Sequence, residues 1–381
     1  MNKAVVLNKF NALFGGNPIV IKSPGRINLI GEHTDYNMGF VMPAATDKAI
    51  YIAIAKNDLG KIRLHAINLE DTIEVDALNF EKSATSWANY LLGAVNQLQK
   101  SNAIQGFDCV FGGDIPLGAG MSSSSALTCG AAFSLNKLFD LSLSKRDLVE
   151  LCHSVEVEYI GVNGGIMDQF AIIFGKENQV IKLDCWSLEV EYYQAHLNNH
   201  EFVLFDTQVS HNLVATEYNQ RRAECDEGVE TIAWQYPEVK SLRDCSLEML
   251  RNCKGNLNDI VYKRCEYVIL ENQRVLDAAK DFQNNDLEAF GQKMFASHNG
   301  LKNKYDVSCP ELDFLVECVK NNQLVLGARM MGGGFGGCTI NLVVSNNIES
   351  LITSVQKAYK EKFNIDLKAY RANISQGIHI I

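Results

Sequence analysis

Short strand-like runs alternate with longer helix-like runs along the whole chain, and this alternation is the feature that most limits its possible folds. The short runs are rich in β-branched and aromatic side chains, which suit a pleated, half-buried surface. The longer runs repeat apolar residues at the helical period. Expected strands cover residues 19–22, 49–55, 107–111, 180–183, 202–205 and 339–344, and expected helices cover residues 87–99, 125–139, 146–160, 260–282 and 350–362. The mixture predicts an α+β fold and excludes an all-helical bundle.

The length of the chain predicts two lobes. Its 381 residues exceed what a single hydrophobic core usually organises. No repeat, low-complexity tract or proline-rich linker marks a boundary in the sequence. We place the division at Gly175, because the turn-forming residues 175–178 separate a group of glycine-rich motifs from a more polar stretch. The expected domains are therefore residues 1–175 and 176–381.

Charge and cysteine content limit the partners and the compartment. The net charge is −10, whereas nucleic acids and anionic membranes need a basic face. The eleven cysteines include no CxxC pair, which indicates neither a disulfide framework nor a zinc site. The first residues lack the apolar run of a signal peptide, and no stretch approaches the roughly 18 to 20 apolar residues that span a bilayer. We expect a cytoplasmic protein with reduced thiols that binds neither nucleic acid nor membranes.

An anion-binding loop is predicted in residues 116–126, which read PLGAGMSSSSA. Glycines let successive backbone N–H groups turn toward one point, and a helix that begins at the serines adds the positive end of its dipole. A glycine turn with one capping serine would share much of this pattern, but a cap needs only one hydroxyl. Further hydroxyls are hard oxygen donors that can join a Mg²⁺ shell. The chain has no GxxxxGK[ST] pattern, so the Walker-type loop is absent.

A dense cluster of polar side chains lies in residues 23–37, which read SPGRINLIGEHTDYN. Apolar residues space the polar ones, which places several hydrogen-bonding groups at the end of a buried strand. Such a rim suits a polyol, whose hydroxyls both donate and accept hydrogen bonds. A solvated loop is the alternative for Glu32 and His33, and their spacing fits no HExxH or other standard zinc pattern.

The glycine-rich residues 327–338 read GARMMGGGFGGC and contain a formal GxGxxG match at Gly332, Gly334 and Gly337. A dinucleotide fingerprint should follow a strand and open a helix, but here the glycines lead into an expected strand. We expect the segment to let two backbones pack closely, and a tight turn between a helix and a strand is the alternative.

A weaker element is Asp168, which follows the Gly164-Gly165 turn and lies near Met167 and Phe170. Apolar neighbours should leave it poorly solvated, as suits a catalytic carboxylate. An N-terminal helix cap is equally consistent with the sequence.

Together these segments resemble the galactokinase branch of the GHMP kinases. The resemblance runs in order through residues 24–37, 116–127 and 327–338, with further matches at residues 87–90, 165–169, 216–222 and 375–377. GEHTDY is its most specific part, because other kinases of the superfamily lack it. The resemblance implies the two-lobed GHMP kinase fold, with an N-terminal lobe of the ribosomal protein S5 domain 2-like type and a C-terminal ferredoxin-like α/β lobe. Met121 and Ser125 depart from the usual leucine and alanine, and both changes are nearly isosteric.

The implied activity is transfer of the γ-phosphate of Mg·ATP to the C1 hydroxyl of α-D-galactose. The products would be α-D-galactose 1-phosphate and ADP, the first committed step of galactose use in the Leloir pathway. Mg²⁺ is the implied cofactor, ATP and galactose are the implied substrates, and we expect a monomer.

The resemblance also assigns site residues. The implied sugar-binding residues are Glu32, His33, Thr34, Asp35, Gly165, Asp168 and Tyr218. The implied ATP-binding residues are Gly118, Ala119, Gly120, Met121, Ser122, Ser123 and Ser124. The implied Mg²⁺ ligands are Ser124 and Glu156, and the implied catalytic residues are Asp168 and Arg26.

Asp168 is the candidate general base for the proton of the C1 hydroxyl. A carboxylate is a weak base, and a neighbouring Arg26 weakens it further, so we expect Asp168 to orient the hydroxyl and accept its proton late. The alternatives are a related kinase for N-acetylgalactosamine or arabinose and a non-catalytic galactose sensor. The presence of Arg26, Asp168, Ser124 and Glu156 argues against the sensor.

Overall fold

The largest sheet forms the base of the N-terminal half. The computed structural model of the chain describes residues 1–116, 118–209 and 214–381. Among them, six strands lie in the order β13-β1-β3-β6-β4-β5, and only β4 and β6 pair in parallel. The strands are β1 (Ile19–Asn28), β3 (Pro43–Lys56), β4 (Lys61–Ala66), β5 (Asp71–Asp76), β6 (Phe107–Gly113) and β13 (His379–Ile380).

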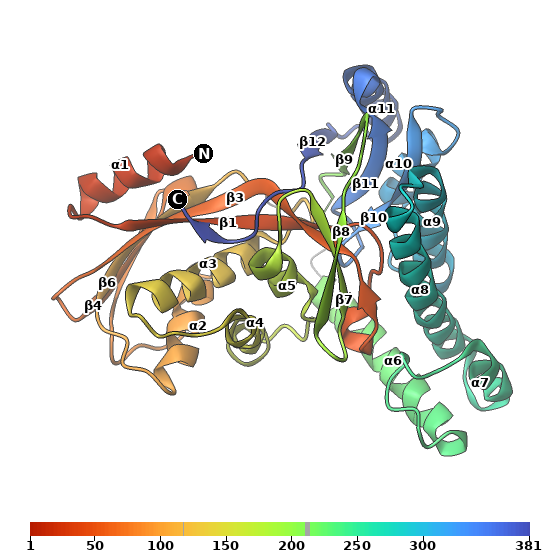
Figure 1. Ribbon diagram of the computed structural model, residues 1–381, viewed down its shortest axis with the longest axis horizontal. Helices are drawn as coiled ribbons and strands as arrows, with labels where there is room; N and C mark the ends of the chain where they lie inside the picture. Colours follow the sequence, from red (N-terminus) through yellow and green to blue (C-terminus); the bar gives the residue numbers. More distant parts are fainter. Residues whose placement is uncertain (117, 210–213) are drawn as a thin grey trace.

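Helices cover both faces of this sheet (Figure 1). The N-terminal helix lies on one face, where Val6 and Phe10 pack on the sheet. The other face carries four helices, of which α3 lies closest because its side chains are small. A Cβ on Gly130 would lie 2.5 Å from Ile52 and 3.1 Å from Ser23. The helices are α1 (Lys3–Leu13), α2 (Ala88–Gln99), α3 (Ser123–Leu138), α4 (Lys145–Ser154) and α5 (Met167–Phe174).

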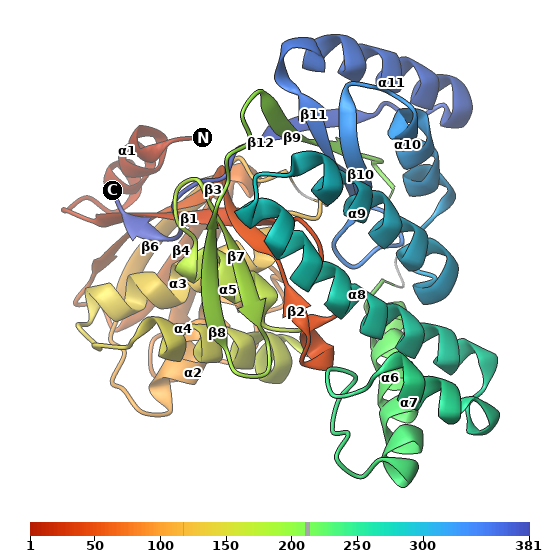
Figure 2. The same cartoon turned by 45° about the vertical axis from the view of Figure 1, so that its right-hand side comes forward.

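A second, antiparallel sheet forms the C-terminal half. Its strands are β9 (His200–Asp206), β10 (Val325–Met331), β11 (Cys338–Val344) and β12 (Lys368–Ala372), in the order β10-β11-β9-β12. This is the strand order of a ferredoxin-like lobe. Helices α10 (Pro310–Lys320) and α11 (Ile348–Phe363) cover one face (Figure 2). Val203 and Phe205 pack against these helices, while Phe202 and Leu204 join the main core, as the alternation of side chains along a strand requires.

A small sheet and a helical region complete the fold. The small sheet joins β2 (Phe40–Val41), β7 (Gln179–Asp184) and β8 (Glu189–Gln194). The helical region comprises α6 (Val214–Gln235), α7 (Leu247–Asn252), α8 (Asp259–Gln283), α9 (Leu287–Gly300) and the π-helical turn η5 (Leu301–Tyr305). Figure 2 shows α8 running from the tip formed by α6 and α7 to the middle of the molecule.

The expected elements and the expected α+β, two-lobed fold are confirmed, with one change. The expected helix over residues 146–160 is α4 followed by a π-helical turn, η3 (Val155–Ile160). The division at Gly175 stays a prediction, because strands from both sides of it share sheets. β7 pairs with β2, and β13 at the C-terminus pairs with β1.

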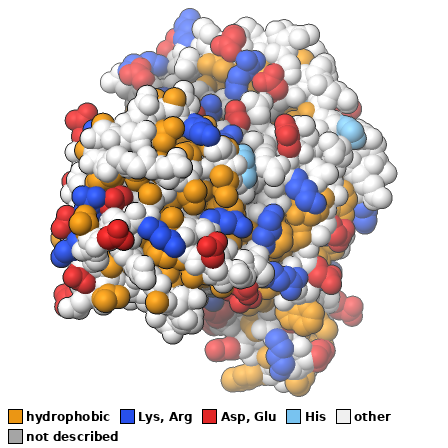
Figure 3. All heavy atoms as spheres, turned by 60° about the vertical axis from the view of Figure 1, so that its left-hand side comes forward, with side chains coloured by type: hydrophobic (Ala, Val, Ile, Leu, Met, Phe, Trp, Pro, Cys, Tyr) orange, Lys and Arg blue, Asp and Glu red, His pale blue; other side chains and the backbone are white. Residues whose placement is uncertain are grey.

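The surface mixes charges of both signs. Figure 3 shows acidic and basic side chains interspersed over the face that it draws, between small groups of apolar ones. Within the described ranges, no helix is both long enough and apolar enough to cross a membrane.

The packing of α9 on β10 generates the first prediction. A Cβ on Gly291 would lie 2.2 Å from the Leu326 carbonyl oxygen, so the helix touches the strand through bare backbone. We expect Gly291→Ala to lower the free energy of unfolding by about 1–3 kcal/mol, because overpacking forces the two elements apart. Urea denaturation measures this change. The control is Gly255→Ala, since no atom lies within 4 Å of a Cβ there. Equal stability of the two variants would contradict the prediction.

Candidate active site

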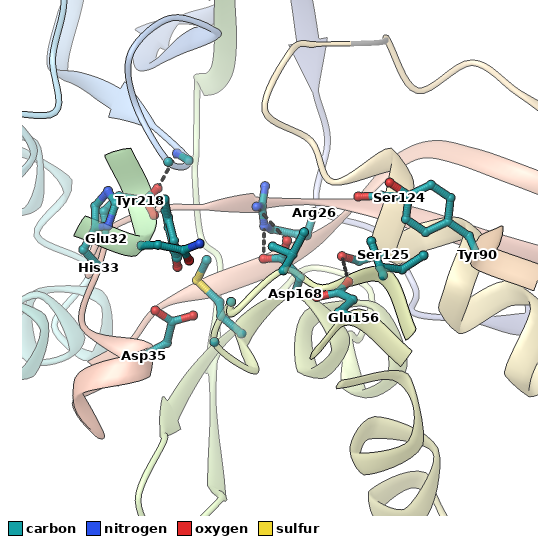
Figure 4. Close-up of a pocket in the computed structure, with 18 residues that line it drawn as sticks. Arg26, Glu32, His33, Asp35, Tyr90, Ser124, Ser125, Glu156, Asp168 and Tyr218 are labelled. Carbon is teal, nitrogen blue, oxygen red and sulfur yellow. Dashed lines mark hydrogen bonds and ion pairs between the residues drawn. The ribbon is translucent and has the colours of Figure 1, made fainter. Parts of the chain in front are cut away.

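A cavity of about 400 Å³ lies between the two lobes. Figure 4 shows its labelled side chains in two groups, with Asp168 and Arg26 between them. The predicted site residues on its wall are Arg26, Glu32, His33, Asp35, Ser124, Glu156, Gly165, Asp168 and Tyr218. Segments far apart in the sequence therefore meet at one place.

Glu32 is held on this wall by the third glycine-rich segment. Its Oε1 accepts hydrogen bonds from Arg329 Nη2 at 3.0 Å and from the Gly332 N–H at 2.8 Å. Arg329 has no exposed surface and Glu32 almost none, so each charge depends on the other. Both bonds reach Oε1, which leaves Oε2 to accept from a ligand.

Asp35 and Gly165 are packed against each other. A Cβ on Gly165 would lie 1.9 Å from Asp35 Oδ2, so only glycine fits beside this carboxyl group. Burial raises the pKa of Asp35 to about 7, and the negative charge of Asp168 acts in the same direction.

Thr34 lies outside the cavity wall. It is fully buried, and its hydroxyl is 2.9 Å from the Gly31 carbonyl oxygen and 2.6 Å from that of Phe40. These hydrogen bonds hold in place the turn that carries Glu32, His33 and Asp35 at the cavity wall. The structure therefore gives Thr34 backbone partners inside the protein, whereas the resemblance implies a sugar contact.

Asp168 is fixed by a bidentate pair with Arg26. Arg26 Nε lies 2.6 Å from Oδ1 and Nη2 lies 2.9 Å from Oδ2, the fork geometry in which guanidinium and carboxylate bind most strongly. Arg26 Nη1 donates to the Gly120 carbonyl, and the Ser122 hydroxyl donates to Oδ2 of Asp168. Asp168 lies in the first turn of α5, where the helix dipole favours a negative charge.

The loop before α3 has the backbone that its glycines predict. Gly118 and Gly120 have φ angles of +79° and +66°, and Ser122 has a φ of 54° immediately before the helix. The third glycine-rich segment packs on this loop, since a Cβ on Gly120 would lie 3.3 Å from the Met331 carbonyl oxygen. Close backbone packing is thus confirmed.

The position of the third segment also corrects one alternative. The segment connects the two strands β10 and β11, and not a helix and a strand. Gly332 and Gly333 moreover lie on the cavity wall, a position that packing alone does not require.

Glu156 lies on the π-helical turn η3, a local irregularity that often occurs at functional sites. Its Oε1 accepts a hydrogen bond from Ser125 Oγ at 2.6 Å. Burial is the main cause that raises the pKa of Glu156 to about 7, and the Ser125 hydrogen bond opposes it. Within the described residues Glu156 forms no ion pair, so a cation would be stabilised there. Carboxylate and hydroxyl oxygens are the ligands that Mg²⁺ takes, and this donor set fits the metal.

Comparison with known proteins identifies the family. The galactokinase galactose-binding signature matches residues 8–56, the GHMP kinase N-terminal domain matches residues 89–176, and the GHMP kinase C-terminal domain matches residues 278–361. A galactokinase of Thermotoga neapolitana is 36% identical over 95% of this chain and 99% of the relative. A galactokinase of Clostridium perfringens is 40% identical over 93% of each chain. The chain belongs to the galactokinase family.

Solved structures agree with this assignment. The crystal structure of Lactococcus lactis galactokinase complexed with galactose superposes with a TM-score of 0.94 at 35% identity, covering 99% of both chains. The mevalonate kinase of Methanococcus jannaschii superposes with a TM-score of 0.66 at 21% identity, covering 94% of this chain and 99% of that one, which shows the shared fold alone. ATP is the co-substrate that membership of the galactokinase family implies.

Several wall residues of this galactokinase family member are missing from the sequence prediction. Tyr90, Ser125 and Gly333 line the cavity. Ser122, an implied ATP-binding residue, donates a hydrogen bond to Asp168. Tyr90 lies within the family match at residues 87–90, which was the only available signal. In the sequence Ser125 is one of four serines and departs from the usual alanine, and in the structure it is the serine that contacts Glu156.

The raised pKa values predict a pH-dependent stability. Asp35 and Glu156 have folded-state pKa values of about 7, above the ordinary ~4 of a carboxyl group. The folded state therefore holds these protons more tightly, and the free energy of unfolding falls as the pH rises from about 4 to about 7. In Asp35→Asn we expect the free energy of unfolding to fall less steeply with pH. The slope should differ from that of the unmodified protein by up to about 1.4 kcal/mol per pH unit. Chemical denaturation at several pH values tests this, with Asp366→Asn at an exposed carboxylate as the control. Parallel profiles for Asp35→Asn and the unmodified protein would disprove it.

Proposed function

We propose that this member of the galactokinase family transfers the γ-phosphate of Mg·ATP to the C1 hydroxyl of α-D-galactose, giving α-D-galactose 1-phosphate and ADP. One observation carries the proposal. Asp168, fixed by Arg26, lies in one cavity between hydrogen-bonding groups of the GEHTDY segment and the N-terminus of α3. A sugar hydroxyl and a phosphate could therefore meet beside the same carboxylate.

The sugar would lie against the GEHTDY side. Glu32 Oε2 and the buried, unpartnered Nε2 of His33 are available for hydroxyl groups on this wall. Asp35 and Tyr218 would contact further hydroxyls, with Gly165 keeping Asp35 in place. A polyol suits this wall because its hydroxyls can both donate to carboxylates and pair with imidazole. Thr34 would contribute indirectly, because its hydrogen bonds hold the turn that carries these sugar-binding residues.

The ATP phosphates would lie against the loop of residues 118–124. The first helical hydrogen bond of α3 runs from the Ala126 N–H to the Ser122 carbonyl. The N–H groups of residues 123–125 are among those that a helix cannot satisfy internally, and together with the helix dipole they attract phosphate oxygens.

Mg²⁺ would be held by Glu156 and by the hydroxyl of Ser124. Bound there, Mg²⁺ supplies positive charge that offsets the charge of the transferring phosphoryl group. Ser124 and Ser125 both reach the cavity, but Ser125 is the one that donates to Glu156. Ser125 therefore either orients Glu156 or shares the ligand role.

Asp168 would orient the C1 hydroxyl and take its proton. Oδ2 already accepts from Arg26 and Ser122, whereas Oδ1 accepts only from Arg26. A carboxylate oxygen has two lone pairs, so Oδ1 keeps one for the hydroxyl of the sugar. Phosphoryl transfer proceeds through a loose transition state, in which a weak base that takes the proton late is sufficient.

The reaction would take place in the cytoplasm on a monomer. All cysteine side chains except that of Cys318 are buried, which supports thiols that stay reduced. Sedimentation of the purified protein measures the oligomeric state, and a dimer would refute the monomer.

The direct test of the proposed function is substrate choice. Initial rates of ADP release with Mg·ATP are compared for galactose, N-acetylgalactosamine, arabinose and mevalonate. We expect galactose to give the highest kcat/KM. ADP release with another sugar alone would assign a different kinase, and binding of galactose without ADP release would indicate a sensor.

Removal of the proposed base separates chemistry from binding. We expect Asp168→Asn to lower kcat by about 10²-fold or more, because the amide cannot accept the proton. Galactose affinity, measured by calorimetry, should stay within a few fold. Asp108→Asn is a matched control, since Asp108 forms a bidentate pair with Arg63 at 2.6 and 2.7 Å outside the cavity. Near-normal turnover of Asp168→Asn would remove Asp168 from this role.

The proposed metal ligands predict a changed Mg²⁺ dependence. We expect Glu156→Gln and Ser124→Ala to need about tenfold or more Mg²⁺ for half-maximal rate and to bind Mg·ADP more weakly in calorimetry. Glu158→Gln is the control, because Glu158 lies on the same turn but pairs with Lys100 at the surface. If Ser125→Ala alone shifts Mg·ADP affinity, Ser125 replaces Ser124 as the ligand.

A further inference from the structure

A chain of hydrogen bonds runs from the cavity wall into the helical region. His33 Nδ1 lies 2.7 Å from Tyr36 Oη, which lies 2.8 Å from Tyr305 Oη, which lies 3.2 Å from Cys225 Sγ. All four side chains are buried. Of these residues, only His33 lines the cavity. The other three therefore have no direct access to a substrate.

The second ring nitrogen of His33, Nε2, takes no part in this chain of hydrogen bonds. Nε2 is buried and has no hydrogen-bond partner among the described residues. Burial lowers the pKa of His33 to about 4, against the raising effect of the Glu32 charge. The ring is therefore neutral near pH 7 and carries one N–H, on either nitrogen.

The chain favours the proton on Nε2. A separation of 2.7 Å is at the short end for an N–H donor, whose usual distance is about 2.9–3.0 Å, and suits a hydroxyl donor better. Tyr36 then donates to Nδ1, and Tyr305 donates to Tyr36.

We propose that Tyr36, Tyr305 and Cys225 are positioning residues that fix His33 as an Nε2–H donor toward one hydroxyl of the sugar. This inference rests on the proposed function, in which galactose occupies the cavity. The buried chain thus takes part in choosing the substrate without touching it.

Helix α6 contributes residues at both ends of the hydrogen-bonded chain. The Tyr218 ring lies 5.3 Å from the His33 ring, and Cys225 follows two turns later on the same helix. Between them, Arg221 donates from Nε to the Tyr305 carbonyl at 2.9 Å and from Nη2 to the Asp306 carbonyl at 2.7 Å. The segment at residues 216–222 therefore orients the phenol in the middle of the chain.

Tyr305→Phe removes one hydroxyl from the chain and adds no charge or volume. Without that hydroxyl, Tyr36 is free to accept from Nδ1, and the ring loses its preference for one tautomer. The loss concerns a single hydrogen bond to the sugar. We expect KM for galactose to rise about three- to tenfold, the value of one neutral hydrogen bond. kcat and KM for ATP should change less than twofold.

A series of deoxy sugars separates this role from general destabilisation. KM is measured for galactose and for its 2-, 3-, 4- and 6-deoxy derivatives with the unmodified protein and with Tyr305→Phe. For the one derivative that lacks the partner of His33, both proteins should have the same KM. Tyr359→Phe is the matched control, since Tyr359 lies on α11 outside the cavity wall and its buried hydroxyl donates to the Thr207 carbonyl at 2.9 Å. An equal rise for every sugar, or no rise, would overturn the proposal.

The tautomer can be measured without any substrate. ¹⁵N resonances of labelled histidine should show Nε2–H at His33 in the unmodified protein and a mixture in Tyr305→Phe. Cys225→Ser keeps a hydrogen-bonding group and should preserve the Nε2–H state, whereas Cys225→Ala should shift it toward the mixture. An Nδ1–H ring in the unmodified protein would refute the assignment. If the unmodified protein fails to phosphorylate galactose, the proposed function fails, but the tautomer measurement still decides whether the chain orients His33.

Discussion

A fully buried guanidinium, that of Arg329, joins the two lobes at the point where the site is built. Its Nε and Nη2 donate to the carbonyls of Leu29 and Asn28 at 2.9 and 2.6 Å, and Nη1 donates to the Met330 carbonyl at 2.7 Å. Glu32 supplies the compensating charge at 3.0 Å. An isolated buried charge costs several kcal/mol, so this arrangement is stable only with every partner present. The end of β1 is thereby fixed to β10, and the turn that carries the sugar-side residues begins from that fixed point.

Close contacts made by glycines set the remaining distances in the site. Gly120 approaches the Met331 carbonyl, and Gly165 touches the carboxyl group of Asp35. Any larger residue at Gly165 would displace Asp35. Backbone packing of this kind brings the phosphate loop, the third glycine-rich segment and α5 around one small cavity. Side chains of ordinary size would hold these segments farther apart.

The sequence predicts the fold well where a local pattern decides it. The periodicity that predicted a helix over residues 125–139 and strands such as 202–205 reflects burial on one face, and those elements form. The two-residue strands β2 and β13 carry no periodic signal, because their place depends only on pairing with β7 and β1. The division at Gly175 is difficult to read for the same reason.

The site is predicted less completely because its details depend on contacts across the fold. Thr34 has the pattern of a sugar ligand, yet its hydroxyl finds backbone carbonyls nearby. Within a run of four serines, one position changes the direction of a side chain by about 100°, so the sequence cannot say which serine meets Glu156. Tyr305 and Cys225 belong to no motif, and their connection to His33 appears only when α6 and η5 are packed together.

The distribution of charge around the cavity follows from these same contacts. Four carboxyl groups lie on the cavity wall, those of Glu32, Asp35, Glu156 and Asp168. The negative charge of Asp168 acts together with burial to raise the pKa of Asp35 and that of Glu156. Glu32 and Asp168 each have a guanidinium partner, Arg329 and Arg26, whereas Asp35 and Glu156 form no ion pair among the described residues and have raised pKa values. Of these two paired carboxylates, Asp168 is the one placed between the two groups of wall residues. Arg26 fixes the direction of this carboxylate through both of its oxygens before any ligand arrives.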